Sequence, residues 1–143
     1  VREVFQLDEN WRPLQYIQND FEDQGEVVVD HATGLMWQKS GSDIWLSYQK
    51  AETYIKILNQ ESFVNYNDWR LSTVEELVSL LESEKQPNDL YINSIFDKKQ
   101  WWCWSADKHS TGAAWLVSFH DGGVGWSKFD SSLVYVRAVR STN

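Results

Sequence analysis

The 143-residue chain contains a single cysteine, Cys103, and no long apolar run. One cysteine cannot close an intramolecular disulfide, and without a Cys-x-x-Cys pair the sequence offers no cysteine-based zinc site. A membrane-spanning helix needs roughly eighteen consecutive apolar residues, so we expect no membrane insertion. The N-terminus lacks a signal-like apolar stretch, and the chain starts at Val1, which suggests a processed product or one domain of a larger multidomain protein.

Basic residues are also scarce, with 13 Lys and Arg against 21 Asp and Glu and a net charge of −8. Nucleic-acid-binding proteins gather Lys and Arg into a basic patch, and no such run is present here. The sequence therefore excludes nucleic acid as a partner, and it disfavours sulfated polyanions for the same reason.

Aromatic residues, in contrast, are abundant, at 15% of the chain with nine tryptophans, and 42% of residues are hydrophobic. This composition is typical of one folded domain rather than a disordered chain. The densest segment is QWWCWSADKH, residues 100–109. Strand alternation sends Trp101 and Cys103 to one face and Trp102 and Trp104 to the other, so at least one ring should lie near solvent.

Two short strands and a helix are predicted in the first part of the chain. Val27–Val29 and Leu35–Gln38 are typical of strands, and Asp30–Gly34 between them carries turn residues. Ser47 is a suitable N-cap for a helix. The apolar face of that helix follows helical spacing at Tyr48, Ala51, Ile55 and Leu58.

A second helix is predicted after the extended segment at residues 69–71. Ser72 or Thr73 can cap it, with a glutamate three residues further on as in a capping box. Its apolar face comprises Val74, Leu77, Val78 and Leu81. We expect the polar run before Pro87 to end this helix.

The last third of the chain favours four short strands at residues 101–106, 113–119, 124–129 and 133–140. Asp121-Gly122-Gly123 is a hairpin signal between the second and third of them. Strands, two helices and then a run of antiparallel strands indicate an α+β fold.

Several motifs together resemble the Lcl C-terminal domain family, named for the C-terminal domain of a bacterial collagen-like adhesin. They are VVDHATGLMWQ, NDWRLSTVEEL, WSAD, AWLVSFHDGGVGW and YVRAVR, in this order from about Gly25 to Arg140. The resemblance implies a C-type-lectin-like fold, with two helices packed on short antiparallel sheets. Residues 1–24 would then be a lead-in packed on the domain at residues 25–143.

The resemblance also bears on disulfides and on location. Many relatives have cysteines at the positions of Ile55 and Ala138, which implies that this chain has lost one disulfide as a unit. The family suggests a cell-surface or secreted location, whereas the missing bridge and missing signal keep the cytoplasm as an alternative.

The sequence shows no constellation typical of catalysis or metal binding. Related formylglycine-generating enzymes need a reactive cysteine pair, and the histidines at 31, 109 and 120 lack metal-ligand spacing. QPND at residues 86–89 resembles the sugar-and-calcium tripeptide of true C-type lectins, but its companion motif is missing. We therefore expect a protein that is not an enzyme and that binds no metal or cofactor. If the chain were instead an enzyme, its only candidate catalytic residues would be Asp107, His109, His120 and Asp121.

In lectin-like folds, ligands generally meet the late strands and their loops, which here are residues 107–111, 120–123 and 126–132. Aromatic rings beside polar groups suit the recognition of a glycan or a protein. The candidate ligand-binding residues are Trp102, Asp107, His109, His120, Asp121, Trp126, Lys128 and Asp130. The alternative is a diversified receptor module of a diversity-generating retroelement, another branch of the same fold.

Overall fold

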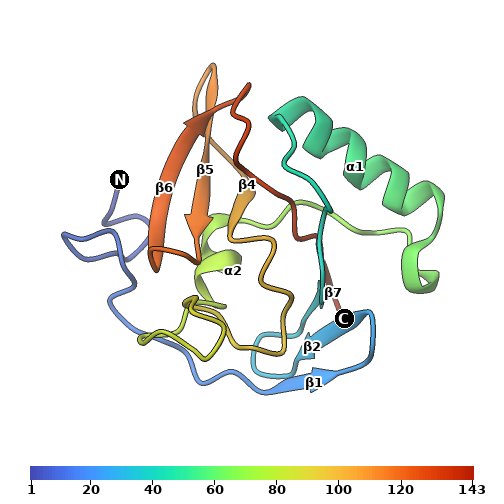
Figure 1. Ribbon diagram of the computed structural model, residues 1–143, viewed down its shortest axis with the longest axis horizontal. Coiled ribbons are helices and arrows are strands. Elements are labelled where there is room, and N and C mark those ends of the chain that lie inside the picture. The colour runs from blue at the N-terminus through green and yellow to red at the C-terminus, as the bar shows by residue number, and fades with distance from the viewer.

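The computed structural model describes all of residues 1–143 and shows an α+β fold with two small antiparallel sheets and two α-helices (Figure 1). The first sheet has the order β1-β2-β3-β7, from Phe21–Asp23, Val27–Asp30, Leu35–Gln38 and Val139–Ser141. The second has the order β4-β5-β6, from Trp102–Ser110, Ala113–Ser118 and Gly123–Lys128. The predicted α+β class is confirmed.

The predicted hairpin at residues 27–38 forms strands β2 and β3, with Val28 opposite Trp37. Both strands are buried along their whole length, because side chains from their two faces enter different apolar clusters. The buried carboxylate of Asp30 accepts hydrogen bonds from the backbone N–H groups of Asp20 and Ala32, at 2.9 and 3.0 Å. These bonds fix the preceding segment to the turn.

Helix α1 spans Tyr48–Gln60 and begins after Ser47, whose Oγ accepts a hydrogen bond from the N–H of Lys50. The predicted cap is thus confirmed. Tyr48 and Ala51 pack with the second sheet, whereas Leu58 packs with the first, so α1 bridges the two sheets.

Helix α2 is shorter than the sequence suggests and covers only Val74–Val78. Thr73, rather than Ser72, is its N-cap, and it forms a capping box with Glu76. The prediction that the helical face continues to Leu81 is wrong. Leu81 is buried beyond the helix end, where it forms an isolated bridge with Ile92 and draws the chain into an irregular segment.

The predicted final strand at 133–140 is also wrong in its extent. Tyr135 makes only an isolated bridge with Cys103, and the strand proper, β7, begins at Val139 and pairs with β3. Residues 134–138 cross from one sheet to the other. Val134 and Val136 are nevertheless buried in the cluster that contains Tyr48 and Trp104, and Ala138 is buried in the cluster that contains Trp69.

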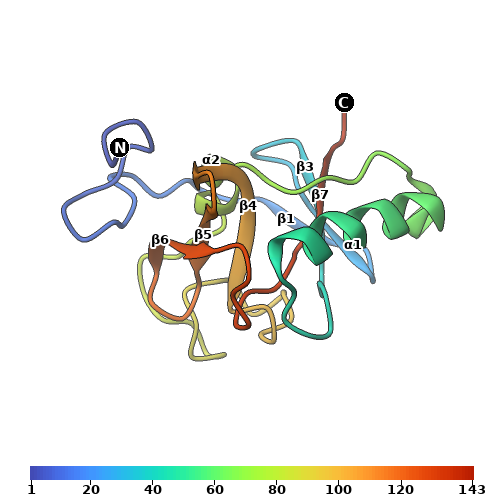
Figure 2. The same ribbon diagram turned by 90° about the horizontal axis from the view of Figure 1, so that it is seen from above.

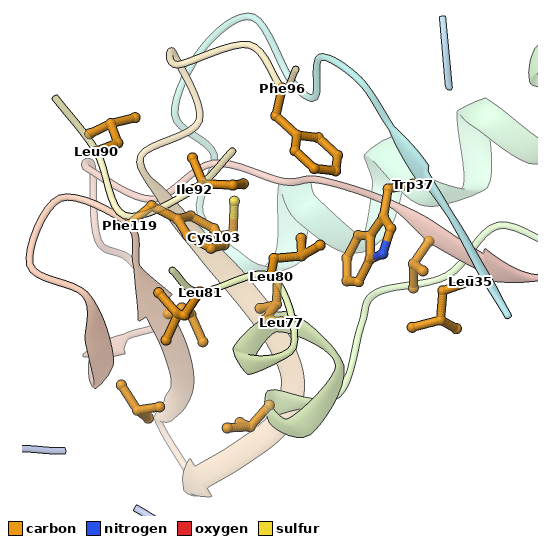
Figure 3. Close-up of a cluster of buried hydrophobic side chains, with 14 of the residues drawn as sticks. Leu35, Trp37, Leu77, Leu80, Leu81, Leu90, Ile92, Phe96, Cys103 and Phe119 are labelled. Atoms are coloured by element: carbon orange, nitrogen blue, oxygen red, sulfur yellow. The ribbon is translucent and has the colours of Figure 1, made fainter. Parts of the chain in front are cut away.

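The main core lies between α2 and the sheets and gathers apolar side chains from most elements (Figure 3). Trp37, Leu77, Leu80 and Phe119 are fully buried within it. Cys103 also lies in this core, and its burial raises the pKa of the thiol to about 11. The thiol is therefore protonated at neutral pH and poorly nucleophilic.

The positions implied to carry a disulfide in relatives are apolar and packed here. Ala138 belongs to the third core cluster, and Ile55 from α1 packs against the same cluster. An apolar contact region thus lies where a bridge would otherwise join α1 to the C-terminal segment.

The N-terminal lead-in packs on the body through Leu7, Phe5, Trp11 and Phe21, all of which contact the main core. Tyr16, by contrast, is largely exposed. In both views the first part of the lead-in lies on the outer side of β6, and the chain then runs across the molecule to β1 (Figures 1 and 2). Strand β1, within the lead-in, pairs with β2.

Candidate ligand-binding surface

Strand β6 is an edge strand, and it has a hollow on each side. Its register pairs Trp126 with Trp115 and Gly125 with Leu116 of β5. Because side chains alternate along strands, Trp115 and Trp126 lie on one face, while Leu116 and Ser127 lie on the other. The fold therefore presents two different surfaces along one exposed edge.

The first hollow, of about 740 Å³, is lined in large part by aromatic rings from the lead-in and from strands β4, β5 and β6. We call it the aromatic hollow; the residues that line it include Trp11, Lys108, His109, Trp115 and Trp126. The His109 ring stacks on Trp126 at 4.4 Å between centroids and meets the edge of Trp115 at 4.7 Å. Trp11 stacks on Trp115 at 5.6 Å.

The rings of this hollow differ sharply in exposure. Trp115 is 7% exposed and forms the base, whereas Trp126 is 52% exposed at the rim. A half-exposed indole with one face supported by another ring offers a flat apolar surface to a ligand.

The second hollow, of about 640 Å³, is polar and lies on the opposite face of β6. We call it the polar hollow; it is lined by Asn10, Arg12, Trp102, Leu116, Ser118, Asp121, Ser127 and the β6 backbone. The Arg12 guanidinium donates to the backbone oxygen of Asp121 at 2.9 Å, and Ser118 Oγ donates to the Asp121 carboxylate at 2.8 Å.

Two glycines allow the lead-in to complete both hollows. Gly122 turns the β5–β6 hairpin with a φ of +82°, which favours glycine. A Cβ on Gly123 would lie 2.8 Å from the backbone oxygen of Trp11. That same oxygen accepts a hydrogen bond from Val124 N–H at 2.9 Å, so the lead-in packs directly against the start of β6.

The structure brings half of the predicted residues into the hollows. Trp102 and Asp121 line the polar hollow, and His109 and Trp126 line the aromatic hollow. Lys128 is exposed two residues beyond Trp126, on the same face, and Asp130 is exposed beyond the end of β6. His120 is exposed beside Trp101, with ring centroids 5.7 Å apart.

The sequence prediction missed the contribution of the lead-in. Asn10, Arg12 and Trp11 line the hollows although they lie more than ninety residues from β6 along the chain. Trp11 belongs to the lead-in, which the sequence predicts only to pack on the domain. Its stacking on Trp115 combines both roles, and no local sequence signal indicates that pairing.

Asp107 has a structural partner rather than a place in either hollow. Its carboxylate accepts a hydrogen bond from the backbone N–H of Val74 at 2.8 Å, at the first turn of α2. A carboxylate at a helix N-terminus satisfies an otherwise unpaired donor and interacts favourably with the helix dipole. Asp107 thus fixes α2 against strand β4.

Replacing Asp107 by alanine should therefore lower stability and leave ligand binding intact. Loss of the charge-assisted bond to Val74 N–H is expected to lower the free energy of unfolding by about 1–2 kcal/mol. Urea denaturation measures the change, with Asp130→Ala as the control at an exposed carboxylate that has no such partner. Equal stability of the two variants would contradict this role.

The three histidines lie in separate environments. His31 contacts Glu22 at 2.7 Å, and this hydrogen bond raises the pKa of His31. His120 lies 3.3 Å from the carboxylate of Asp121. His109 packs between Trp115 and Trp126. No group of three or more His, Cys, Asp or Glu side chains is arranged to hold a metal ion.

Neither α-helix is sufficiently long and apolar to traverse a bilayer.

Comparison of the chain with models of known protein families finds a match to one family. The model of the Lcl C-terminal domain matches residues 26–140, which includes strands β2 to β6 and all but the last residue of β7. It covers Trp102, His109, Asp121 and Trp126 but not the lead-in residues that complete the hollows. Among curated proteins, none matches the chain significantly.

Proposed function

The chain belongs to the Lcl C-terminal domain family, and from this premise we propose that it is a non-catalytic recognition domain. Its ligand, a glycan or a protein, binds at the β6 surface, meaning the aromatic hollow and the polar hollow together. The proposed fold is the C-type-lectin-like one that the resemblance implies. Two helices, short antiparallel sheets and a late-strand surface at the edge of the molecule are consistent with it.

The observation that carries this proposal is the arrangement of Trp126. More than half of this large apolar side chain is exposed, although burial of an indole would normally stabilise the fold. It is held in place by His109 and continues into a hollow whose base is Trp115. A pre-formed aromatic surface with polar groups nearby is the usual form of a ligand-binding site.

A recognition role also agrees with the contacts made by the four residues that an enzyme would have to use. Asp107 is engaged with α2, and Asp121 is engaged with Ser118. His109 packs among tryptophans, and His120 lies at the exposed hairpin beside Trp101. Asp121 also contacts His120 at 3.3 Å, but Asp107 and His109 take no part in these bonds, so the four residues do not form one shared unit for acid–base or nucleophilic catalysis.

The proposal is tested by offering the labelled chain to an immobilised glycan array and to a peptide display library, each with and without excess EDTA. We expect capture in at least one collection, and we expect that capture to persist in EDTA, because stacking on aromatic rings needs no bound ion. Capture only in the presence of calcium would contradict the proposed mode of binding. No capture in either collection would contradict the proposed function.

A further inference from the structure

The outer edge of β6 carries backbone groups that the protein itself does not pair. In an antiparallel ladder, alternate residues direct their N–H and C=O groups to opposite sides. Val124 N–H points outward, since it donates to Trp11 outside the sheet. Trp126 and Lys128 share its parity, so their backbone groups also point away from β5.

The lead-in covers only the first part of this edge. The hydrogen bonds outside the strand ladders include Val124 N–H as a donor and Lys128 C=O as an acceptor for Ser131. They include neither the N–H nor the C=O of Trp126, nor the N–H of Lys128. These three groups form a free segment of sheet edge next to both hollows.

The hollows lie where the side chains of an added strand would point. Residues of an extended peptide alternate between the two faces of a sheet. A strand laid beside Trp126 would direct every second side chain toward the aromatic hollow and the others toward the polar hollow. The free edge supplies the main-chain bonds, and the hollows supply selectivity, as in peptide recognition by strand addition.

Charge around the aromatic hollow indicates the chemistry of the added strand. Lys108 lines this hollow and Lys128 lies on its face of β6, whereas no Asp or Glu lines it. This local excess of positive charge occurs on a chain of net charge −8. Carboxylates on either side of a large apolar residue would complement the two lysines.

We propose that β6 binds an extended acidic segment of a partner protein as an additional strand, with an aromatic side chain in the aromatic hollow. The inference rests on the proposed function and names the ligand class of that same surface. A second copy of the chain is a poorer occupant, because its own β6 presents Lys128 rather than a carboxylate and both copies carry the same net charge.

The test uses a defined probe, the blocked heptapeptide Thr-Glu-Thr-Trp-Thr-Glu-Thr, titrated into the isotopically labelled wild-type chain. Amide resonances of Trp126 and Lys128 are expected to shift on binding. N-methylation of the peptide, one amide at a time, should weaken binding about tenfold at every second amide and much less at the others. A peptide with lysines in place of its two glutamates should also bind about tenfold more weakly.

On the protein side, Lys128→Pro and Lys128→Ala form a matched pair. Both remove the charge, but only proline removes the outward N–H, and this position makes no ladder bond through that group. Binding of the heptapeptide should weaken about tenfold more in Lys128→Pro than in Lys128→Ala. Spectroscopic comparison of the two variants verifies that both keep the native fold.

Three outcomes would overturn the inference. The first is no binding of the heptapeptide although a glycan binds in a Trp126-dependent manner, which leaves the proposed function intact. The second is binding that N-methylation does not weaken in an alternating pattern. The third is a dimer in solution that Lys128→Pro dissociates, which would make a second copy the occupant. Loss of both peptide and glycan binding would contradict the proposed function as well.

Discussion

Replacing Arg137 by alanine is expected to lower the free energy of unfolding by about 3–5 kcal/mol. Arg137 is 1% exposed and lies in the crossing segment between the sheets. Its Nη1 donates to the backbone oxygens of Gln38 and Lys39, and its Nη2 donates to that of Asp97 at 2.9 Å.

The size of this effect follows from what the substitution leaves behind. The backbone oxygens of Gln38 and Asp97 would lose the guanidinium as a donor, and a large cavity would remain beside Phe96, over whose ring the guanidinium lies at 4.9 Å. Arg137→Lys should also be strongly destabilising, because an ammonium group cannot reproduce the fork of donors. These carbonyls belong to separate segments, so Arg137 ties the end of β3 to the irregular region before β4.

Chemical denaturation with tryptophan fluorescence as the probe measures both variants. Lys98→Ala is the matched control, because Lys98 is exposed and lies next to Asp97 in the chain. If Arg137→Ala changed stability no more than Lys98→Ala, the buried guanidinium would not be the structural tie described above.

Replacing Trp126 by alanine is expected to weaken ligand binding at least about thirtyfold, which corresponds to about 2 kcal/mol. Tryptophans at the centre of a binding surface commonly contribute this much, because they bury a large area with little loss of conformational freedom. Trp126 forms the exposed rim of the aromatic hollow, so its loss removes the apolar surface that this hollow offers to a ligand. Isothermal titration with the captured ligand measures the effect.

Trp45→Ala is the control for this prediction. Trp45 is 47% exposed, close to the value for Trp126, but it lies on the segment before α1 and lines neither hollow. It should bind ligand within about twofold of the wild type. Equal losses of affinity in the two variants would indicate a general effect of removing an exposed indole rather than a site at β6.

Local features of the fold could be predicted because short-range chemistry determines them. The hairpin at residues 27–38 follows from β-branched residues flanking a turn, and Ser47 begins α1 as an N-cap. Gly122 allows the left-handed turn between β5 and β6. The expected division of the tryptophan cluster is also confirmed, since Trp104 is fully buried while Trp101 is 41% exposed.

The errors concern residues whose environment depends on distant parts of the chain. The alternating pattern at 133–140 is typical of a strand, but Val134 and Val136 pack in one core cluster while Ala138 and Val139 pack in two others. Arg137 in that pattern gives no sign that its charge is buried. Asp107 is likewise indistinguishable from a solvent-exposed loop carboxylate until α2 is placed beside β4.

The sequence predicted the part of the candidate surface that lies on the C-terminal strands and their loops, but not the part contributed by the lead-in. His109, Asp121 and Trp126 could be named because the family resemblance directs attention to the late loops. Arg12 and Trp11 could not, because their position depends on the close approach of the lead-in to Gly123, at the other end of the chain.

The central claim, that ligand binds at the β6 surface, is tested most directly by oxidative footprinting of exposed tryptophans in the intact wild-type chain. Trp45, Trp101 and Trp126 are the exposed indoles, and mass spectrometry follows the oxidation of each one with and without the captured ligand. We predict that ligand protects Trp126 from oxidation and leaves Trp45 as reactive as before. Protection of Trp45 with no change at Trp126 would contradict the claim.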